Sequence, residues 1–303
     1  MPDSTPLSSL GEDAALQRIL ACIHAPMGAE LLLGPGDDCA VCRRDAEWDT
    51  LLKTDAVVEG VHFTPDTPPQ LIGRKALARA VSDIAAMGGL PEHALITILA
   101  HPGRSICTLE GIYSGLSQLA AEFGICIAGG ETTSLPHDGL ALSITLTGKV
   151  ERGCAILRSG GKPGDVLCVS GALGGSFASG RHLSFTPRVA LARELLRLGL
   201  RPHAMMDLSD GLAADLPRLA RASHCGYTLS EPQLPRHPGC TVQQAMSDGE
   251  DYELLLALPP ALAEMLPRHP ELGLTPIGHL TPGSAHPLQG GWQHFSSPTH
   301  HQA

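Results

Sequence analysis

The stretch PQLIGRKALARAVSDIAAMGGLPEHALITILA, residues 69–100, is decisive for the fold class, because a helical pattern runs directly into a strand pattern. Its first half has apolar residues at helical spacing, and Gly88-Gly89 followed by Pro91 is typical of a helix end. HALITILA, residues 93–100, then predicts a strand. Helices and strands that alternate in this way indicate an α/β or α+β protein.

The same alternation continues on both sides of this stretch. We expect helices over residues 12–27 and about 108–123, and strands over 49–63, 124–130 and 140–150. A second series follows, with strands at 166–171, 204–210 and 249–258 and helices at about 187–198 and 211–223. Between the two series, residues 151–165 concentrate glycine, proline and charge. We therefore predict an N-terminal domain at 1–150 and a C-terminal domain at 151–303.

The composition fits a folded globular protein, with 303 residues, 43% of them hydrophobic, and a formal net charge of −10. There is no stripe rich in Lys and Arg, which argues against nucleic-acid binding, because such binding depends on cations that neutralise phosphates. No apolar run approaches the ~20 residues of a membrane span, and the start of the chain lacks the features of a secretory signal. We expect a cytoplasmic protein that binds neither nucleic acid nor membrane.

The nine cysteines are odd in number and mostly lie in apolar stretches, which predicts reduced, buried thiols. Cys39 and Cys42 form a CxxC pair, but a structural zinc site requires a second pair at similar spacing, and the sequence has none. Metal or redox use of this pair is the less favoured alternative.

Acidic residues recur where expected strands end or glycine turns begin, which is where a backbone leaves room for ligands. They are Asp37, Asp38, Asp55, Asp83, Glu131, Asp207, Asp210, Glu250 and Asp251. Any one of them alone is explained as well by a cap or a turn. Adjacent carboxylates repel each other, however, and burying them is costly unless a cation compensates. Together these residues predict a site for hard cations such as Mg²⁺, which prefer carboxylate oxygens and substrate phosphates.

The chemistry predicted from such a site is phosphoryl transfer from a nucleotide, in which metal ions offset the charge on both reactants. The chain has no GxxxxGK[ST] loop, and the glycine-rich turn GALGGS at 171–176 lacks the lysine of that motif. The protein-kinase motifs are missing too. The sequence therefore predicts a kinase built on another scaffold.

Eight segments, in this order, resemble the thiamine-monophosphate kinase family, whose superfamily includes aminoimidazole ribonucleotide synthetase, selenophosphate synthetase and a hydrogenase maturation protein. The segments are GPGDDCAV (34–41), KTDAVVEGVHF (53–63), KALARAVSDIAAMGGLP (75–91), GGETT (129–133), RSGGKPGD (158–165), DLSDGLAADL (207–216), GEDYELL (249–255) and GWQHF (291–295). The resemblance implies a two-domain fold similar to that of aminoimidazole ribonucleotide synthetase. In this fold an N-terminal mixed-sheet domain forms a barrel with its twin in a homodimer, and a C-terminal α/β domain covers the site.

The resemblance also implies a reaction, in which ATP is the co-substrate and thiamine monophosphate becomes thiamine diphosphate by direct in-line transfer, with several Mg²⁺ ions. No catalytic acid or base is implied. The implied Mg²⁺ ligands are Asp38, Thr54, Asp55, Asp83, Glu131, Asp207 and Asp210. The implied ATP contacts are Gly130, Glu131, Arg158 and Ser209, and the implied contacts to thiamine phosphate are His62, Glu250 and Trp292. The alternatives are a strand histidine for His62 and a hydrophobic clasp for Trp292.

The chain departs from the family pattern in three places. Glu131 stands where the family has aspartate, and the extra methylene displaces its carboxylate. Lys53 stands where relatives have Ser or Thr at a metal site, so it either substitutes its own charge for an ion or points outward. The segment between GALGGS and SFTPR is also shorter than the family pattern. Two other functions therefore stay open: an enzyme of the superfamily with another acceptor, and a non-enzymatic nucleotide- or thiamine-binding protein.

Overall fold

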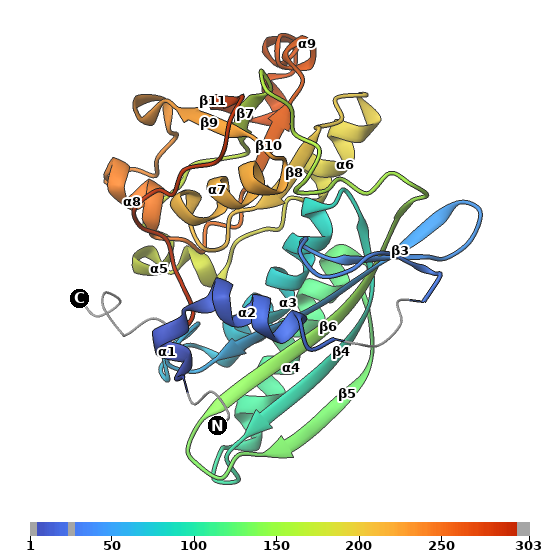
Figure 1. The fold of residues 1–303 in the computed structure, drawn as a ribbon. Coiled ribbons are helices and arrows are strands. Elements are labelled where there is room, and N and C mark those ends of the chain that lie inside the picture. The colour runs from blue at the N-terminus through green and yellow to red at the C-terminus, as the bar shows by residue number, and fades with distance from the viewer. Residues whose placement is uncertain (1–4, 24–27, 296–303) are drawn as a thin grey trace.

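The computed structural model describes residues 5–23 and 28–295, which form two β-sheets with helices packed on them (Figure 1). The first sheet has the strand order β1-β2-β3-β6-β4-β5. Its strands are β1 Leu31–Leu33, β2 Ala40–Arg43, β3 Trp48–Val58, β4 Leu90–Ala100, β5 Cys126–Ser134 and β6 Leu140–Glu151. β4 and β5 are parallel and the other neighbours are antiparallel, which confirms the expected mixed sheet.

Two long helices, α3 Pro69–Ala86 and α4 Ile106–Phe123, pack against each other and cover one face of the first sheet (Figure 1). Their apolar side chains share one buried core with the strands. The two helices approach closely at Gly73, where a Cβ atom would lie 2.0 Å from the carbonyl oxygen of Ile112. The predicted helix end is confirmed, since α3 stops at Ala86 and Gly88 has a φ of +73°. β4 begins three residues earlier than predicted, because the chain pairs with β6 directly after this turn.

The second sheet is antiparallel throughout, with the order β8-β10-β7-β11-β9. Its strands are β7 Val166–Val169, β8 Ala204–Asp207, β9 Gly226–Leu229, β10 Leu254–Leu258 and β11 Thr275–Thr281. Helix α7 Leu212–Ala222 packs on one face and helix α6 Val189–Arg197 on the other. The interior strand β10 is therefore buried on both faces, which explains its uninterrupted apolar sequence.

Residues 152–165 connect the two sheets, and the two halves meet at helices α3 and α6. Val189 of α6 joins the core of the first sheet, and Ala86 of α3 joins a core of the second. The predicted division between residues 150 and 151 falls near the end of β6 and stays a prediction.

Short elements complete the described fold. They are α1 Leu7–Leu10, α2 Glu12–Leu20, α5 Ser176–Ser179, α8 Val242–Ser247, α9 Pro260–Ala263 and the 3₁₀ turns η1 Arg181–Leu183, η2 Glu231–Gln233, η3 Leu266–Arg268 and η4 Pro270–Leu272. The helix predicted over 12–27 ends at Leu20, and residues 24–27 of that prediction lie outside the described residues. Of the helices that the structure describes, none has the length and apolar character needed to cross a bilayer.

Candidate active site

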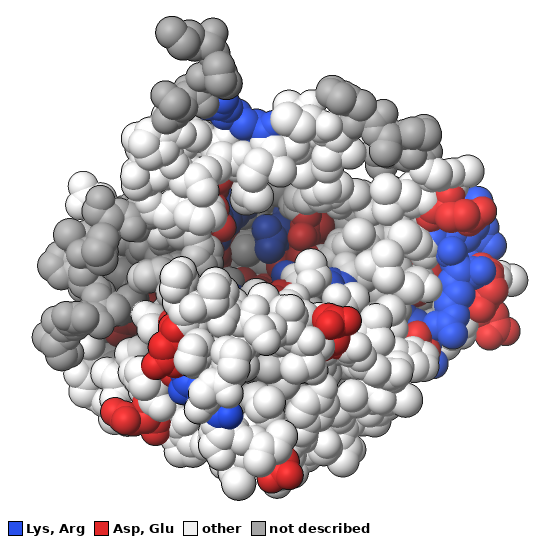
Figure 2. All heavy atoms as spheres, turned by 90° about the horizontal axis from the view of Figure 1, so that it is seen from below, with Lys and Arg blue, Asp and Glu red and all other residues white. Residues whose placement is uncertain are grey.

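A cavity of about 720 Å³ lies between the two halves of the chain. Seen from below, the surface is hollowed, and acidic and basic side chains lie inside the hollow (Figure 2). The first sheet and its helices contribute Lys53, Asp55, Arg79 and Asp83, and the second half contributes Arg158, Asp207, Ser209, Asp210, Asp215, Arg218 and Tyr252. Helix α2 adds Glu12, Asp13, Leu16 and Gln17 at one wall. The cavity thus combines segments that are far apart in the sequence.

Three buried aspartates meet beside the cavity, and one carboxylate oxygen of each lies within 4.8 Å of the others. Asp83 and Asp207 line the cavity itself. Asp38 precedes β2, Asp83 lies in the last turn of α3, and Asp207 ends β8. Their exposed fractions are 2%, 6% and 3%. The Oδ2 atom of Asp38 is buried and has no hydrogen-bond partner. Carboxylate oxygens in this arrangement are the ligands that Mg²⁺ prefers, so these residues fit a divalent cation.

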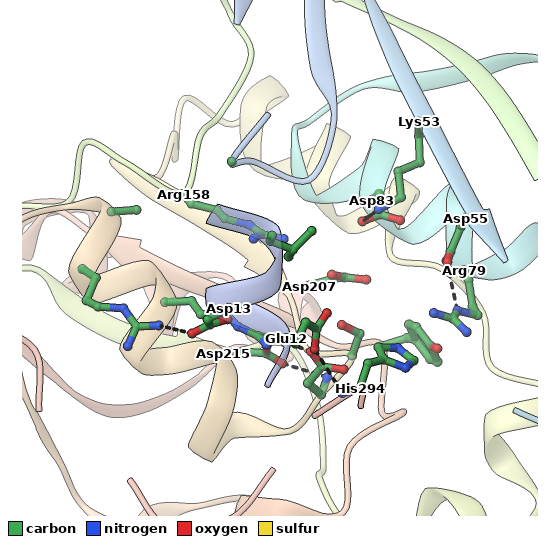
Figure 3. Close-up of a pocket in the computed structure, with 18 of the residues that line it drawn as sticks. Glu12, Asp13, Lys53, Asp55, Arg79, Asp83, Arg158, Asp207, Asp215 and His294 are labelled. Atoms are coloured by element: carbon green, nitrogen blue, oxygen red, sulfur yellow. Dashed lines mark hydrogen bonds and ion pairs between the residues drawn. The ribbon is translucent and has the colours of Figure 1, made fainter. Parts of the chain in front are cut away.

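Three basic side chains neutralise part of this acidic cluster (Figure 3). Lys53 Nζ lies 2.8 Å from Asp83 Oδ1, and Arg158 Nη2 lies 2.6 Å from Asp38 Oδ1. Nearby, Arg79 Nε lies 3.0 Å from Asp55 Oδ2. Asp207 accepts a hydrogen bond of 2.6 Å from the Ser82 hydroxyl, and no ion pair to it is found among the described residues. Basic side chains thus lie close to the carboxylates even without metal. Because all three line the cavity, they can also contact an anionic ligand there.

Two aspartates of the site, Asp37 and Asp207, hold protons more tightly than isolated carboxylates do. Burial, followed by the charge of Asp38, raises the pKa of Asp207 to about 6, and the same two causes raise the pKa of Asp37 to about 6. For Lys53, burial acts in the opposite direction, but the carboxylates of Asp83 and Asp55 hold the pKa above its usual range. Lys53 is therefore a permanent positive charge in this site.

Without metal, the free energy of unfolding is expected to fall as the pH rises from about 4 to about 6. In this window the folded protein holds protons on Asp37 and Asp207 that the unfolded chain has lost, so stability decreases with pH. Urea unfolding in EDTA across this window measures the effect. Asp207→Asn lacks one of these titrating groups and should show a shallower fall, whereas equal slopes in both proteins would contradict the prediction.

A second, smaller recess adjoins the cavity and shares with it Arg79, Ser209, Asp210, Tyr252 and His294. Its other lining residues are Val61, His62, Phe177, Asp248, Glu250 and Trp292. All three predicted thiamine-phosphate contacts therefore line one recess. Residues 292–294 are held in place there, because the main-chain N–H of Trp292 donates to the Asp210 carbonyl at 2.8 Å. His294 also donates its N–H to Glu12 of α2 at 3.1 Å.

A buried lysine organises this recess. Lys75 of α3 is fully buried, and its ammonium lies 2.7 Å from both carboxylate oxygens of Glu250 and also donates to the His62 carbonyl. His62 in turn accepts a hydrogen bond from the Val58 N–H at its Nδ1. Burial, then the charge of Arg79, lowers the pKa of His62 to about 2, so its imidazole is neutral. Glu250 has a φ of +54°, an unfavourable value for a side chain with a Cβ, and Lys75 helps to hold it there.

Two predicted Mg²⁺ ligands lie on the other face of the first sheet. Along β3 the buried positions alternate with open ones, so Lys53 and Asp55 face α3 and Thr54 faces away. Glu131 pairs with Thr97 of β4, whose side chain is also on the open face. Neither Thr54 nor Glu131 lines the cavity, and Gly130 lies exposed on the edge strand β5. Their roles stay predictions.

The remaining predicted residue, Asp210, lines both hollows and pairs with Arg218, which also contacts Asp215 at 2.9 Å. Sequence reasoning missed several residues of the site, foremost Lys75, Arg79 and Arg218. For two of them a signal was present: Lys75, Arg79 and Asp83 are spaced i, i+4 and i+8 on one helix, so they share one face. Charged residues on an otherwise apolar helix face indicate a polar site beneath it.

Comparisons with known proteins show which family this chain belongs to. Residues 36–150 match the family described as AIR synthase related protein, N-terminal domain. A thiamine-monophosphate kinase of Rhodopirellula baltica is 37% identical over 261 residues, which cover 78% of this chain and 79% of the relative. This chain belongs to the thiamine-monophosphate kinase family. The family member of Escherichia coli K12 is 36% identical over 252 residues, 75% of this chain and 76% of that protein.

Solved structures of the thiamine-monophosphate kinase family share the fold. The structure of AaThiL complexed with AMPPCP and TMP has a TM-score of 0.84 and 28% identity, and the match covers 96% of this chain and 99% of that one. A structure of the hydrogenase maturation protein HypE has a TM-score of 0.66 at 20% identity, which shows the fold alone. The two-sheet architecture is thus that of a solved member of the kinase family, and HypE shares the fold.

Proposed function

We propose that the protein transfers the γ-phosphate of ATP in line to thiamine monophosphate, giving thiamine diphosphate and ADP. The observation that carries this proposal is the triad of Asp38, Asp83 and Asp207, with an unpartnered carboxylate oxygen, next to a separate recess. Such an arrangement suits two anionic reactants that meet at a cation site. The family relationship supports the same reaction.

Mg²⁺ would be held at the cluster that Asp38 and Asp207 form with Asp83, with Asp55 and Asp210 at the cavity walls. Bound there, it would offset the negative charge of the two phosphate groups that must approach each other. The number of ions and the predicted ligand roles of Thr54 and Glu131 belong to this proposal. Arg158 and Arg79 line the same cavity and would orient the anionic groups. No general base is required, because the acceptor phosphate is already ionised at neutral pH.

The recess would hold the thiamine part of the acceptor. Its positively charged thiazolium suits the face of the Trp292 indole and the carboxylate of Glu250. His62 is neutral and therefore adds no positive charge to repel it. Gly130 and Ser209 complete the proposed nucleotide contacts, of which Ser209 lines the cavity.

We also propose a cytoplasmic homodimer that is formed through the first sheet. The support is the face opposite α3, where the apolar side chains of Leu52, Val58 and Leu95 are 39–48% exposed. β5 also ends this sheet as an exposed edge strand. Exposed apolar surface and an unpaired edge are features of protein–protein contacts.

The test is a kinase assay on protein that has been separated by size. Thiamine diphosphate formation is expected to depend on Mg²⁺ and to follow the species with twice the chain mass of 31.7 kDa. Asp55→Asn should remove detectable turnover, because Asp55 lines the cavity, whereas the exposed control Asp138→Asn should not. Bound ATP or thiamine monophosphate without product at any Mg²⁺ concentration would instead indicate a binding protein. ADP release with another phosphorylated acceptor alone would indicate a different enzyme.

A further inference from the structure

Lys53 places a positive charge inside the acidic cluster. β3 fixes the position of its backbone, because Lys53 pairs with Leu146 of β6, and the strand alternation turns its side chain toward α3. Its Nζ atom lies 2.8 Å from Asp83 Oδ1, and the lysine side chain is 21% exposed. In Figure 3 the two side chains point toward each other at the edge of the cavity. The contact is therefore built into the sheet and does not depend on a flexible loop.

Asp83 needs such a compensating charge more than its neighbours do. It lies in the last turn of α3, where the negative end of the helix disfavours a carboxylate. Asp38 already has Arg158 as a partner, and Asp207 has the Ser82 hydroxyl. Among the described residues, Lys53 is the cation found in an ion pair with Asp83.

We propose, on the premise of the metal-assisted reaction above, that the Lys53 ammonium is a resident cation that takes the place of one divalent ion at Asp83. A divalent ion and an ammonium at the same carboxylate repel each other strongly in a partly buried site. The lysine is part of the chain and is always present. The divalent ion is therefore the cation that is excluded from the Asp83 carboxylate. Asp38 Oδ2, which has no partner, and Asp207 then remain as the ligands open to a divalent ion.

The experiment counts Mn²⁺ bound to the full chain by equilibrium dialysis, in the absence of ATP and thiamine monophosphate. Lys53→Met removes the charge at nearly constant length and is expected to bind one more Mn²⁺ per chain than the wild type, or to bind its first ion at least about tenfold more tightly. Lys53→Arg keeps the charge and should bind as the wild type does. Lys162→Met is the matched control, because Lys162 lies exposed in a turn outside the cavity.

Thermal unfolding supplies a second readout that does not depend on the count. Mn²⁺ is expected to raise the unfolding temperature of Lys53→Met more than that of the wild type, and to restore folding if this variant is unfolded without metal. Lys53→Thr, which leaves room for an ion, should behave in the same way. Equal Mn²⁺ counts and affinities in wild type and Lys53→Met, or a failure of Mn²⁺ to restore an unfolded variant, would overturn the proposal.

Both readouts are independent of the phosphoryl-transfer assay. An inactive wild type whose Mn²⁺ binding still responds to Lys53 would refute the proposed kinase function and leave the resident cation in place. If the wild type is active but its Mn²⁺ binding does not change when Lys53 is replaced, the resident cation is refuted and the kinase function is supported.

Discussion

Replacing Asp207 by asparagine is expected to lower kcat/KM for thiamine monophosphate by roughly 10³-fold or more, the scale seen when one preorganised electrostatic group is removed. Asparagine has nearly the same size and can still accept the hydrogen bond from Ser82, so the loss is one of charge. Asp207 is 3% exposed and is held in register by its pairing with Leu254 of β10, so no neighbour can easily replace it. Steady-state rates of ADP release over a range of Mg²⁺ concentrations measure the effect.

The matched control is Asp165→Asn, because Asp165 is equally buried but pairs with His203 outside the cavity. Its activity should stay within a few-fold of the wild type. The Asp207 variant should also unfold at a higher temperature than the wild type in EDTA, because the repulsion between Asp207 and Asp38 is gone. Retention of a tenth of the activity, or a lower unfolding temperature in EDTA, would show that Asp207 does not serve a cation site.

Replacing Lys75 by methionine is expected to reduce the free energy of unfolding by about 3–5 kcal/mol, which is the cost of removing one partner of a buried ion pair. The fully buried ammonium contacts both oxygens of Glu250, and these two residues come from different halves of the chain. Without Lys75, the Glu250 carboxylate remains largely buried and uncompensated. Urea unfolding at neutral pH measures the loss. KM for thiamine monophosphate should rise more than KM for ATP, because Glu250 and His62 line the recess.

A double-mutant cycle separates the ion pair from simple packing. Glu250→Gln combined with Lys75→Met should be less destabilised than the sum of the two single variants, because neither charge is then left alone. Lys149→Met serves as the surface control: its ion pair with Glu92 spans 3.3 Å and its side chain is 32% exposed, so a loss of at most about 1 kcal/mol is expected. Equal losses at Lys75 and Lys149, or strict additivity in the cycle, would contradict a buried ion pair that links the two halves.

Local sequence patterns anticipated most of the regular structure. Helix α3 was predicted because its apolar spacing and its Gly88 stop depend only on nearby residues. The acidic candidates Asp38, Asp83 and Asp207 were found in the same local way, since each follows or precedes a glycine turn or an element end. Their meeting within 4.8 Å agrees with the prediction of a shared cation site.

Other features depend on contacts that no local pattern records. Lys75 and Glu250 are 175 positions apart, and their pairing requires both halves of the chain to be packed. The motifs place Thr54 and Glu131 among the predicted ligands, and only the pleat of β3 and the pairing of β5 show that both lie on the open face of the sheet, where their roles stay predictions. Neighbouring residues on a strand point to opposite faces of the sheet, so a shift of one residue moves a side chain to the other face. A motif read from the sequence does not show which face a side chain occupies.

By itself, the sequence determined the succession of helices and strands and the chemical nature of the site, because spacing and residue type act over a few neighbouring positions. The sequence also shows that a lysine stands at position 53, where the family pattern has Ser or Thr. The three-dimensional packing alone shows which carboxylates face one another, which cation each one contacts, and that Lys53 points toward Asp83 and not outward. These outcomes follow from how the two sheets and their helices pack against each other, because packing brings together residues that lie far apart along the chain.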